Sequence, residues 1–573
     1  YANTTGHSNI AIGQGTLDAN TTGHYNTAVG RIALSSNTTA DENTAVGYNA
    51  LNANTTGSGN VAVGNDALKV NTTGATNTAV GRRSLDANTG GSYNCAFGNS
   101  ALDENTTGSS NTALGTQAMQ NNTTGQYNTA VGKEALQANT GSSWNTAVGY
   151  EALTANTTTG GNTAVGYQAL YALTDGGPNT AVGQASLQAC TSAWGNTAVG
   201  YYAANDTTTG GYNTAVGNEA LEANTTGASN TAIGMRALEA NTTASNNVAV
   251  GYDSLKVNTT GAQNVAVGSY ALNANTTASY NTAVGYYALV SNTTGSESVA
   301  VGRMALDANT TGNANTALGY NALTACVTGS SNVAVGKNAL YNCTDNANVA
   351  IGDDAAQATT TGNSNVAIGY HALYDNTTAS YNVAIGYHAL GNTTTGDQNV
   401  AVGYKALEDN TGVHNTAVGD LALRDNTTGT NHVAVGKDAL RDNTTGESNV
   451  AVGSYTLRVS TTGTANTALG FSALTANTTG NHNTGVGQNA LLANTTGASN
   501  TAIGVDAGLY ITTGDNNTML GKSAGTNSSP SGSITTGSNT ICLGNNSVSA
   551  LYCADTSISS SDARDKTDVE DFK

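Results

Sequence analysis

Apolar residues recur along this chain at a fixed period and in a fixed order. In the stretch that begins at Asn43, the box Asn-Thr-Ala-Val-Gly precedes Tyr-Asn-Ala-Leu-Asn-Ala, and the polar turn Asn-Thr-Thr-Gly comes next. The glycine that closes the box recurs at Gly47 and Gly64, so the period is 17 residues, and it runs from Gly13 to Gly521. A period this strict predicts that each repeat forms one coil of a stacked solenoid.

Side chains in the box alternate as they do in a β-strand. Thr44 and Val46 share one face and Ala45 lies on the other, which predicts a strand buried on both faces. The closing glycine predicts a positive φ or a close backbone approach at a corner. The segment around Leu51 fits a second strand or one helical turn, because so short an apolar run cannot decide between them. In the return turn we expect Asn and Gly to adopt left-handed conformations.

Stacked coils place identical residues above one another. Asn43 and Asn60 are therefore expected to form a ladder in which side-chain amides hydrogen-bond along the axis, with threonine ladders beside it. Each coil carries few large apolar side chains, so we expect other chains to contribute to burial. Packing of the small-residue face, formed by Ala45, Ala62 and Ala79, against another chain would add buried surface at almost no side-chain entropy cost.

Together these patterns predict an all-β fold: an elongated parallel β-solenoid or β-roll of 17-residue coils. A chain of 573 residues would otherwise indicate several domains, but a solenoid grows in one dimension without a central core. The 70 glycines and 2 prolines could also indicate a disordered low-complexity chain. The fixed positions of Val and Leu argue against disorder.

Charge narrows the range of partners. The net charge of −19, from 18 basic and 37 acidic residues, argues against binding to a nucleic-acid backbone. No apolar run approaches the roughly 20 residues that span a bilayer, so we expect no membrane insertion. Charged residues gather just after the box, as at Lys133 and Glu134, which predicts that this edge of each coil faces water.

Candidate chemistry is sparse, and we expect no metal site and no cofactor. The seven histidines and six cysteines show no metal-ligand spacing. Cys326 and Cys343 are 17 residues apart, so stacking would bring their Cα atoms to about 4.8 Å, within disulfide range. The alternative is that both are free thiols that fill small buried spaces. Tyrosine often comes after the box, as at Tyr48 and Tyr150, where it could bind sugars or a protein, or simply cap the coil.

Variants of the box, at residues 60–64 (Asn-Val-Ala-Val-Gly) and 365–369 (Asn-Val-Ala-Ile-Gly), resemble the Ser-Val-Ala-Ile-Gly repeats in the head of YadA-type trimeric autotransporter adhesins. The resemblance covers residues 9 to about 521. It implies a left-handed parallel β-roll in which three chains lie side by side, and hence a homotrimeric fibre. The coil of that family is shorter than 17 residues, so the cross-section here is expected to differ.

The period ends after Gly521, where a Ser/Gly-rich segment leads to a displaced box at residues 539–544. The final residues include Ser-Asp-Ala-Arg-Asp-Lys-Thr-Asp-Val at 561–569, which resembles the opening of the intramolecular chaperone domain of phage tail fibres and tail spikes. In that family the chaperone assembles the trimer and then cuts itself off. The resemblance implies cleavage between Ser561 and Asp562, with Ser561 as the nucleophile and Lys566 assisting it.

These observations divide the chain into a repeat shaft at 1–521, an irregular end of the shaft at 522–560 and the start of a chaperone domain at 561–573. The expected function is the shaft of a trimeric viral or phage tail fibre that contributes to host attachment. Its partner would be a host-surface glycan or protein receptor, and its location the virion tail fibre, the extracellular space or a cell surface. We expect no enzymatic activity apart from self-cleavage. Alternatives are a bacterial trimeric adhesin head and an ice-binding or surface-organising solenoid, which would need a flat, uncharged threonine face.

Overall fold

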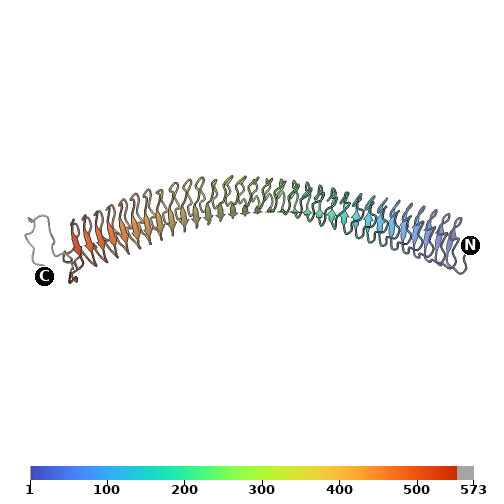
Figure 1. Cartoon of the computed structure of the whole chain (residues 1–573), viewed down its shortest axis with the longest axis horizontal. Coiled ribbons are helices and arrows are strands. Elements are labelled where there is room, and N and C mark those ends of the chain that lie inside the picture. Colours follow the sequence, from blue (N-terminus) through green and yellow to red (C-terminus); the bar gives the residue numbers. More distant parts are fainter. Residues whose placement is uncertain (1, 551–573) are drawn as a thin grey trace, which may run out of the picture. The chain divides into compact units, whose positions relative to one another are not determined.

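The computed structural model describes residues 2–550 and divides them into two compact units, 2–364 and 365–550. Both units are built only from short parallel strands and the loops between them, with no helix among the described residues. Figure 1 shows one strand for each coil, with successive coils side by side within each unit. The predicted parallel β-solenoid is therefore confirmed, and the alternative of one helical turn per coil is wrong.

Each strand has three residues and occupies the centre of the box. The strands of the first unit are β1 (Ile10–Ile12), β2 (Thr27–Val29), β3 (Thr44–Val46), β4 (Val61–Val63), β5 (Thr78–Val80), β6 (Cys95–Phe97), β7 (Thr112–Leu114), β8 (Thr129–Val131), β9 (Thr146–Val148), β10 (Thr163–Val165), β11 (Thr180–Val182), β12 (Thr197–Val199), β13 (Thr214–Val216), β14 (Thr231–Ile233), β15 (Val248–Val250), β16 (Val265–Val267), β17 (Thr282–Val284), β18 (Val299–Val301), β19 (Thr316–Leu318), β20 (Val333–Val335) and β21 (Val349–Ile351). Those of the second unit are β22 (Val366–Ile368), β23 (Val383–Ile385), β24 (Val400–Val402), β25 (Thr416–Val418), β26 (Val433–Val435), β27 (Val450–Val452), β28 (Thr467–Leu469), β29 (Thr484–Val486), β30 (Thr501–Ile503), β31 (Thr518–Leu520) and β32 (Ile541–Leu543).

Within each unit, neighbouring strands pair in parallel and in register. Ala62 of β4, for example, lies opposite Ala45 of β3 and Ala79 of β5. Two coils are one residue shorter than the others, and the strands on either side of each still pair in register. Val333 pairs with Val349, and Val400 pairs with Thr416. In both coils the sequence places the missing residue in the return turn. A solenoid of this kind therefore accepts a change of length where the turn meets solvent.

The last described coil is longer than the others, yet it still stacks. β32 pairs with β31, with Ile541 opposite Thr518, a spacing of 23 residues in place of 17. The backbone N–H of Thr540 donates to Oδ1 of Asn517 at 3.0 Å, so Thr540 takes the place of the box asparagine. The stack therefore continues beyond Gly521, into the segment for which the sequence predicted an irregular end.

We number the residues of a coil from the box asparagine as position 1 to position 17. Beyond the first coil, whose strand is exposed, the core is formed by positions 1, 3, 8, 9 and 12, which in the third coil are the fully buried Asn43, Ala45, Ala50, Leu51 and Asn54. The strand alanines point into their own coil. Positions 2 and 4 of the strand point outward and are only partly buried.

This arrangement corrects two predictions about the strand. Ala45, Ala62 and Ala79 are fully buried within a single chain, so the prediction that chains meet through the alanine face is wrong. The strand is also not buried on both faces, because Thr44 and Val46 remain partly exposed. Any contact with another chain through the strand must therefore use the Thr/Val face.

The segment after the box is neither a strand nor a helical turn. Asn49 and Leu51, at positions 7 and 9, have φ angles of 55° and 52°, in the left-handed region. Their backbone N–H groups bond to the neighbouring coils, as in the 2.9 Å bond from Leu51 to the carbonyl of Ala67. A left-handed conformation costs about 1–2 kcal/mol for a residue with a side chain. Hydrogen bonds between coils and burial of the leucine offset that cost.

Glycine recurs at two places in the coil, at the end of the box and in the return turn, and a different structural constraint requires it at each. Gly47 closes the box with a φ of 139°, and a Cβ on it would lie 2.3 Å from the carbonyl oxygen of Gly64, which confirms the prediction for this position. Gly57 of the return turn has no positive φ, and neither does Asn54. The prediction that this asparagine and this glycine are left-handed is therefore wrong; the positive φ of the return segment lies instead at position 17, as at Gly59 with 70°. Gly57 is required because a Cβ would lie 2.1 Å from the carbonyl oxygen of Gly74.

Two asparagine ladders connect the coils. In the box ladder, the backbone N–H of Asn60 donates to Oδ1 of Asn43 at 2.9 Å, and its Nδ2 donates to the carbonyl of Gly74 at 2.9 Å. In the turn ladder, Nδ2 of Asn71 donates to Oδ1 of Asn54 at 2.8 Å. The box ladder was predicted, whereas the turn ladder was not. Threonines extend the pattern as expected, since the Thr55 hydroxyl donates to the carbonyl of Thr72.

Candidate functional site

The outward strand face is the most regular surface of the described residues. Positions 2 and 4 are Thr, Val, Ile, Leu, Phe or Cys in every strand from β1 to β32, and none of them is charged. The chain as a whole has a net charge of −19, yet no charged side chain lies on this face. A parallel sheet usually has both of its faces covered.

Large apolar side chains on this face are exposed in the single chain. Leu114 of β7 is 49% exposed and Leu318 of β19 is 47% exposed. In the first unit, stacked strands at about 4.8 Å and three residues of about 3.3 Å give a face of roughly 1,000 Å². An ordinary stable protein interface covers about 800 Å² on each partner. The face is therefore large enough to serve as an interface between proteins.

The edge after the box has a different character, as the sequence predicted. Lys133 is half-exposed beside Glu134, and its Nζ lies 5.3 Å from the ring centroid of Tyr150 in the next coil. Tyr150 in turn stacks on Tyr167 at a centroid distance of 5.5 Å and an interplanar angle of 10°. The Tyr150 ring is therefore contacted by a neighbouring side chain from each of the two adjacent coils. This stripe of tyrosines, in which Tyr370 also stacks on Tyr387 and Tyr387 on Tyr404, stabilises the edge.

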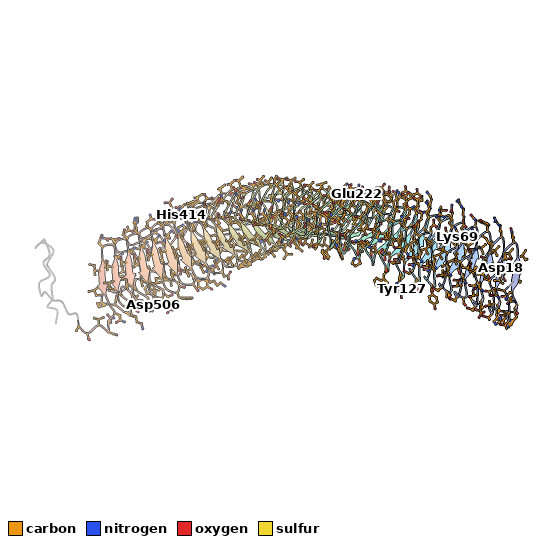
Figure 2. The ribbon with its side chains drawn as sticks, turned by 45° about the vertical axis from the view of Figure 1, so that its right-hand side comes forward. Asp18, Lys69, Tyr127, Glu222, His414 and Asp506 are labelled. Atoms are coloured by element: carbon orange, nitrogen blue, oxygen red, sulfur yellow. The ribbon has the colours of Figure 1, made fainter. Side chains whose placement is uncertain are left out.

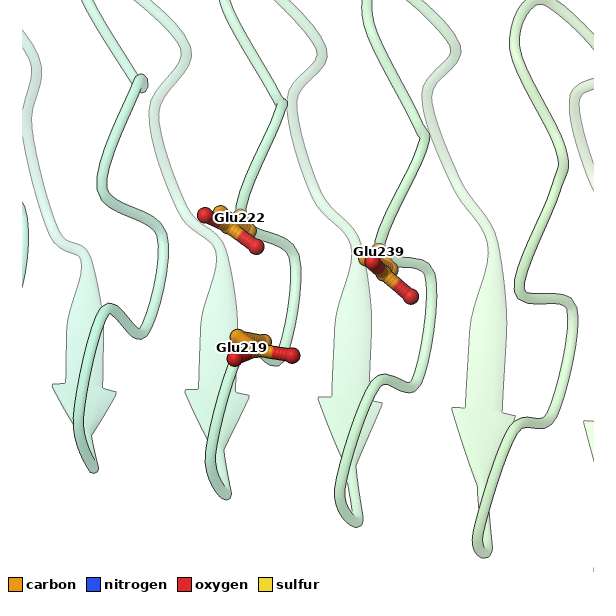
Figure 3. A group of neighbouring side chains, drawn as sticks. All are labelled: Glu219, Glu222 and Glu239. Atoms are coloured by element: carbon orange, nitrogen blue, oxygen red, sulfur yellow. The ribbon is translucent and has the colours of Figure 1, made fainter.

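Three carboxylates lie close together on the first unit. Glu219 and Glu222 come from one coil and Glu239 from the next, as Figure 3 shows, and each offers an oxygen within 4.8 Å of the others. Burial and the neighbouring Glu219 and Glu239 raise the pKa of Glu222. Lys256 lies 3.5 Å from Glu239 and offsets part of this charge. The sequence analysis did not identify this group, although Glu222 and Glu239 are one 17-residue period apart, which is the signal that could have found it.

Cys326 and Cys343 lie in the turn ladder at the place of its asparagine. Both are fully buried free thiols, which is the alternative that the sequence left open beside a disulfide. Burial raises the pKa of Cys326 to about 12 and that of Cys343 to about 11. Neutral thiols react slowly, because the thiolate is the nucleophile. Their arrangement fits small buried side chains that fill the ladder position.

His432 replaces the asparagine of the box ladder and reproduces its bonds. Its backbone N–H donates to Oδ1 of Asn415 at 3.0 Å. Its Nε2 lies 2.7 Å from the carbonyl oxygen of Gly446, so this nitrogen must carry the hydrogen, because a carbonyl can only accept. Its Nδ1 then accepts from the backbone N–H of Asn449 at 3.2 Å. Burial lowers the pKa of His432 to about 4, so the ring is neutral in the folded chain above about pH 4.

We expect acid to weaken the second unit through His432. The unfolded chain binds a proton at this residue below about pH 6.5, whereas the folded chain binds it only near pH 4. The free energy of unfolding should therefore fall by about 3 kcal/mol between these two pH values. Urea denaturation of wild type and His432→Asn at several pH values measures this difference. A variant with the same pH dependence as wild type would contradict it.

The proposed self-cleavage residues Ser561 and Lys566 lie outside the described residues, and their roles stay predictions. The described residues contain no helix that is long and apolar enough to cross a membrane. The chain matches no protein-family model, and no curated protein matches its sequence. The function must therefore be argued from the geometry of the coils.

Proposed function

We propose that this chain is the shaft of a homotrimeric viral or phage tail fibre that contributes to host attachment. The observation that carries the proposal is the uncharged strand face, which repeats in every described coil. Three chains that turn this face inward would bury Val, Ile and Leu side chains and would leave the charged edge in water. The role is structural, and it requires no catalytic site on the shaft.

Two features of the sequence support a fibre of this origin. The YadA-like box implies three chains side by side, and the segment at 561–569 resembles the start of a tail-fibre chaperone. A chaperone that aligns three chains suits a repeat fold, because coils that are nearly identical can pair out of register. Self-cleavage between Ser561 and Asp562 would then release the mature fibre.

The molar mass of the intact chain in solution tests the assembly. We expect light scattering to give three times 57.1 kDa. A mass of 57.1 kDa would contradict the trimer and would leave the strand face in water. The measurement should be repeated at high salt, where contact through an uncharged face should persist.

A bacterial trimeric adhesin head would use the same face, and it would carry a stalk with a membrane anchor, in place of a chaperone, on the C-terminal side of the shaft. An ice-binding solenoid is favoured by one observation, the threonine ladder at position 2 of many strands. Ice binding needs the strand face free, whereas the trimer covers it. Thermal hysteresis together with a monomeric mass would therefore select the ice-binding function.

A further inference from the structure

The two tryptophans of this chain lie at one edge of the first unit. Trp144 occupies position 17 of its coil, and Trp194 occupies position 16 three coils later. Both are exposed, Trp144 by 70% and Trp194 by 53%. A tryptophan this exposed contributes little to the core of a coil, so its placement calls for another explanation.

The two coils between these tryptophans carry almost no side chains at the same edge. Their residues at positions 16 and 17 are Gly160, Gly161, Gly177 and Pro178. The backbones are tightly stacked there, since a Cβ on Gly160 would lie 2.4 Å from the carbonyl oxygen of Ser143. A bare strip of backbone about 14 Å long, three coils at about 4.8 Å, therefore separates the two indole rings.

Proline also leaves a hydrogen-bond acceptor in this strip. The residue at position 17 normally donates its N–H to the carbonyl at position 16 of the preceding coil, as Trp144 does to Gln126 at 3.1 Å and Gly161 to Ser143 at 3.2 Å. Pro178 has no N–H to donate. The carbonyl of Gly160 therefore receives no hydrogen bond from position 17 of the next coil.

One face of the Trp144 ring is open toward the strip. Its other face stacks on Tyr127 at a centroid distance of 6.3 Å and an interplanar angle of 5°. Figure 2 shows Tyr127 projecting away from the ribbon of the first unit. The next coil offers only Gly161 at the equivalent place, so no side chain there covers the indole. This differs from the tyrosine stripe after the box, in which ring faces cover one another.

The edge is also nearly neutral. Among positions 13 to 17 of the coils that end at residues 144, 161, 178 and 195, the only charged residue is Asp175, whose carboxylate accepts from the N–H of Gly176 at 2.8 Å. Threonine and serine hydroxyls make up most of the remaining side chains. Open aromatic faces beside neutral hydrogen-bonding groups favour a ligand that combines apolar C–H faces with many hydroxyls.

We propose that this edge, from Trp144 to Trp194, binds a neutral oligosaccharide. The C–H face of a sugar ring would stack on the indole of Trp144, because the negative face of an aromatic ring attracts the partly positive hydrogens. A sugar hydroxyl would donate to the carbonyl of Gly160. The inference deepens the proposed attachment function by naming its ligand class, but it does not require the trimer, since every group comes from one chain.

Tryptophan fluorescence of the intact chain tests the proposal directly, because both tryptophans lie at this edge. Cellohexaose, maltohexaose and the hexamer of N-acetylglucosamine are the probes, and heparin is the charged control. We expect at least one neutral hexasaccharide to change the indole emission in a saturable way, and heparin to cause no such change. Acrylamide should quench the emission of the free chain, as the exposure of both rings requires.

Variants distinguish binding at this edge from binding elsewhere. Trp144→Ala should weaken binding of the responding sugar about tenfold, as expected for the loss of one aromatic stacking contact. Tyr93→Ala, at the same exposed position of a coil outside the strip, should leave it unchanged. Isothermal titration calorimetry measures the affinity of both variants for the sugar, and circular dichroism tests whether each variant still folds.

Three results would overturn the inference: no response to any of the three hexasaccharides, equal binding by Trp144→Ala and wild type, or indoles that acrylamide cannot reach. Saturable binding of heparin alone would also overturn it, since the ligand would then be recognised by charge. The mass measurement is independent of all four. A trimer that binds no sugar refutes only this inference, and a monomer that binds sugar refutes only the trimeric shaft.

Discussion

Glutamate at Val46, Val80 and Leu114 together is expected to convert a trimer of this chain into single chains of 57.1 kDa. The three residues lie at position 4 of β3, β5 and β7 and point outward, so the core of each coil is left intact. Assembly through this face would bury three carboxylates without partners. Burial of each unpaired charge costs several kcal/mol, and a trimer would bury nine of them, three from each chain, so the trimer should not form.

The matched control replaces Thr39, Thr73 and Thr107 by glutamate. These threonines are exposed in return turns and are spaced two coils apart, as the three strand residues are. The control adds the same charge at the same spacing, and we expect it to keep the mass of wild type. Light scattering compares the three proteins. If the strand variant assembles as wild type does, the strand face is not the interface.

Alanine at Gly149 should destabilise the first unit by about 4 kcal/mol or more, among the largest effects of a single substitution. Gly149 closes a box with a φ of 140°, and a Cβ there would lie 2.2 Å from the carbonyl oxygen of Gly166. The contact joins backbone to backbone, so no side chain can rotate to relieve it. The neighbouring coil would have to move away, and the hydrogen bonds between the two coils would weaken. Urea denaturation followed by circular dichroism measures the loss.

Gly90→Ala is the control for this substitution. Gly90 lies in a return turn without a positive φ, and the nearest atom to a new Cβ would be the Thr73 hydroxyl oxygen at 3.5 Å, an ordinary contact. Its free energy of unfolding should stay close to that of wild type or rise slightly, because alanine restricts the unfolded chain more than glycine does. Equal stability of the two alanine variants would show that the box glycine is not required for close approach.

Much of this fold could be predicted because identical residues recur at identical spacing. The period determined the pairing of Ala45 with Ala62, and asparagine at each coil implied the ladder that joins Asn43 to Asn60. The direction of the strand faces could not be predicted, since both alanine and valine are apolar and either could fill a core. The coil closes tightly, with Ala50 and Leu51 also inside, and only alanine leaves room for them.

The left-handed leucines could not be predicted for a different reason. Leucine disfavours a positive φ, so local preference argues against the conformation that Leu51 adopts. The hydrogen bond from its N–H to the carbonyl of Ala67 in the next coil stabilises it, and this bond forms only after the coils stack. The candidate site was partly hidden in the same way. Trp144 and Trp194 are 50 residues apart, one short of three periods, so the period alone does not place them at one edge.

The buried turn asparagine has a consequence for chemical modification. Asn54 opens the triplet Asn-Thr-Thr, an acceptor for N-linked glycosylation, and comparable triplets recur in most coils. In the folded chain Asn54 is fully buried, and its Nδ2 donates to Oδ1 of Asn37 and to the carbonyl of Gly57. The stacked coils are thus closed to a glycosyltransferase. A glycan attached before folding would occupy the core of the coil and block its stacking, so in a secretory pathway these coils would have to close before the enzyme reached them.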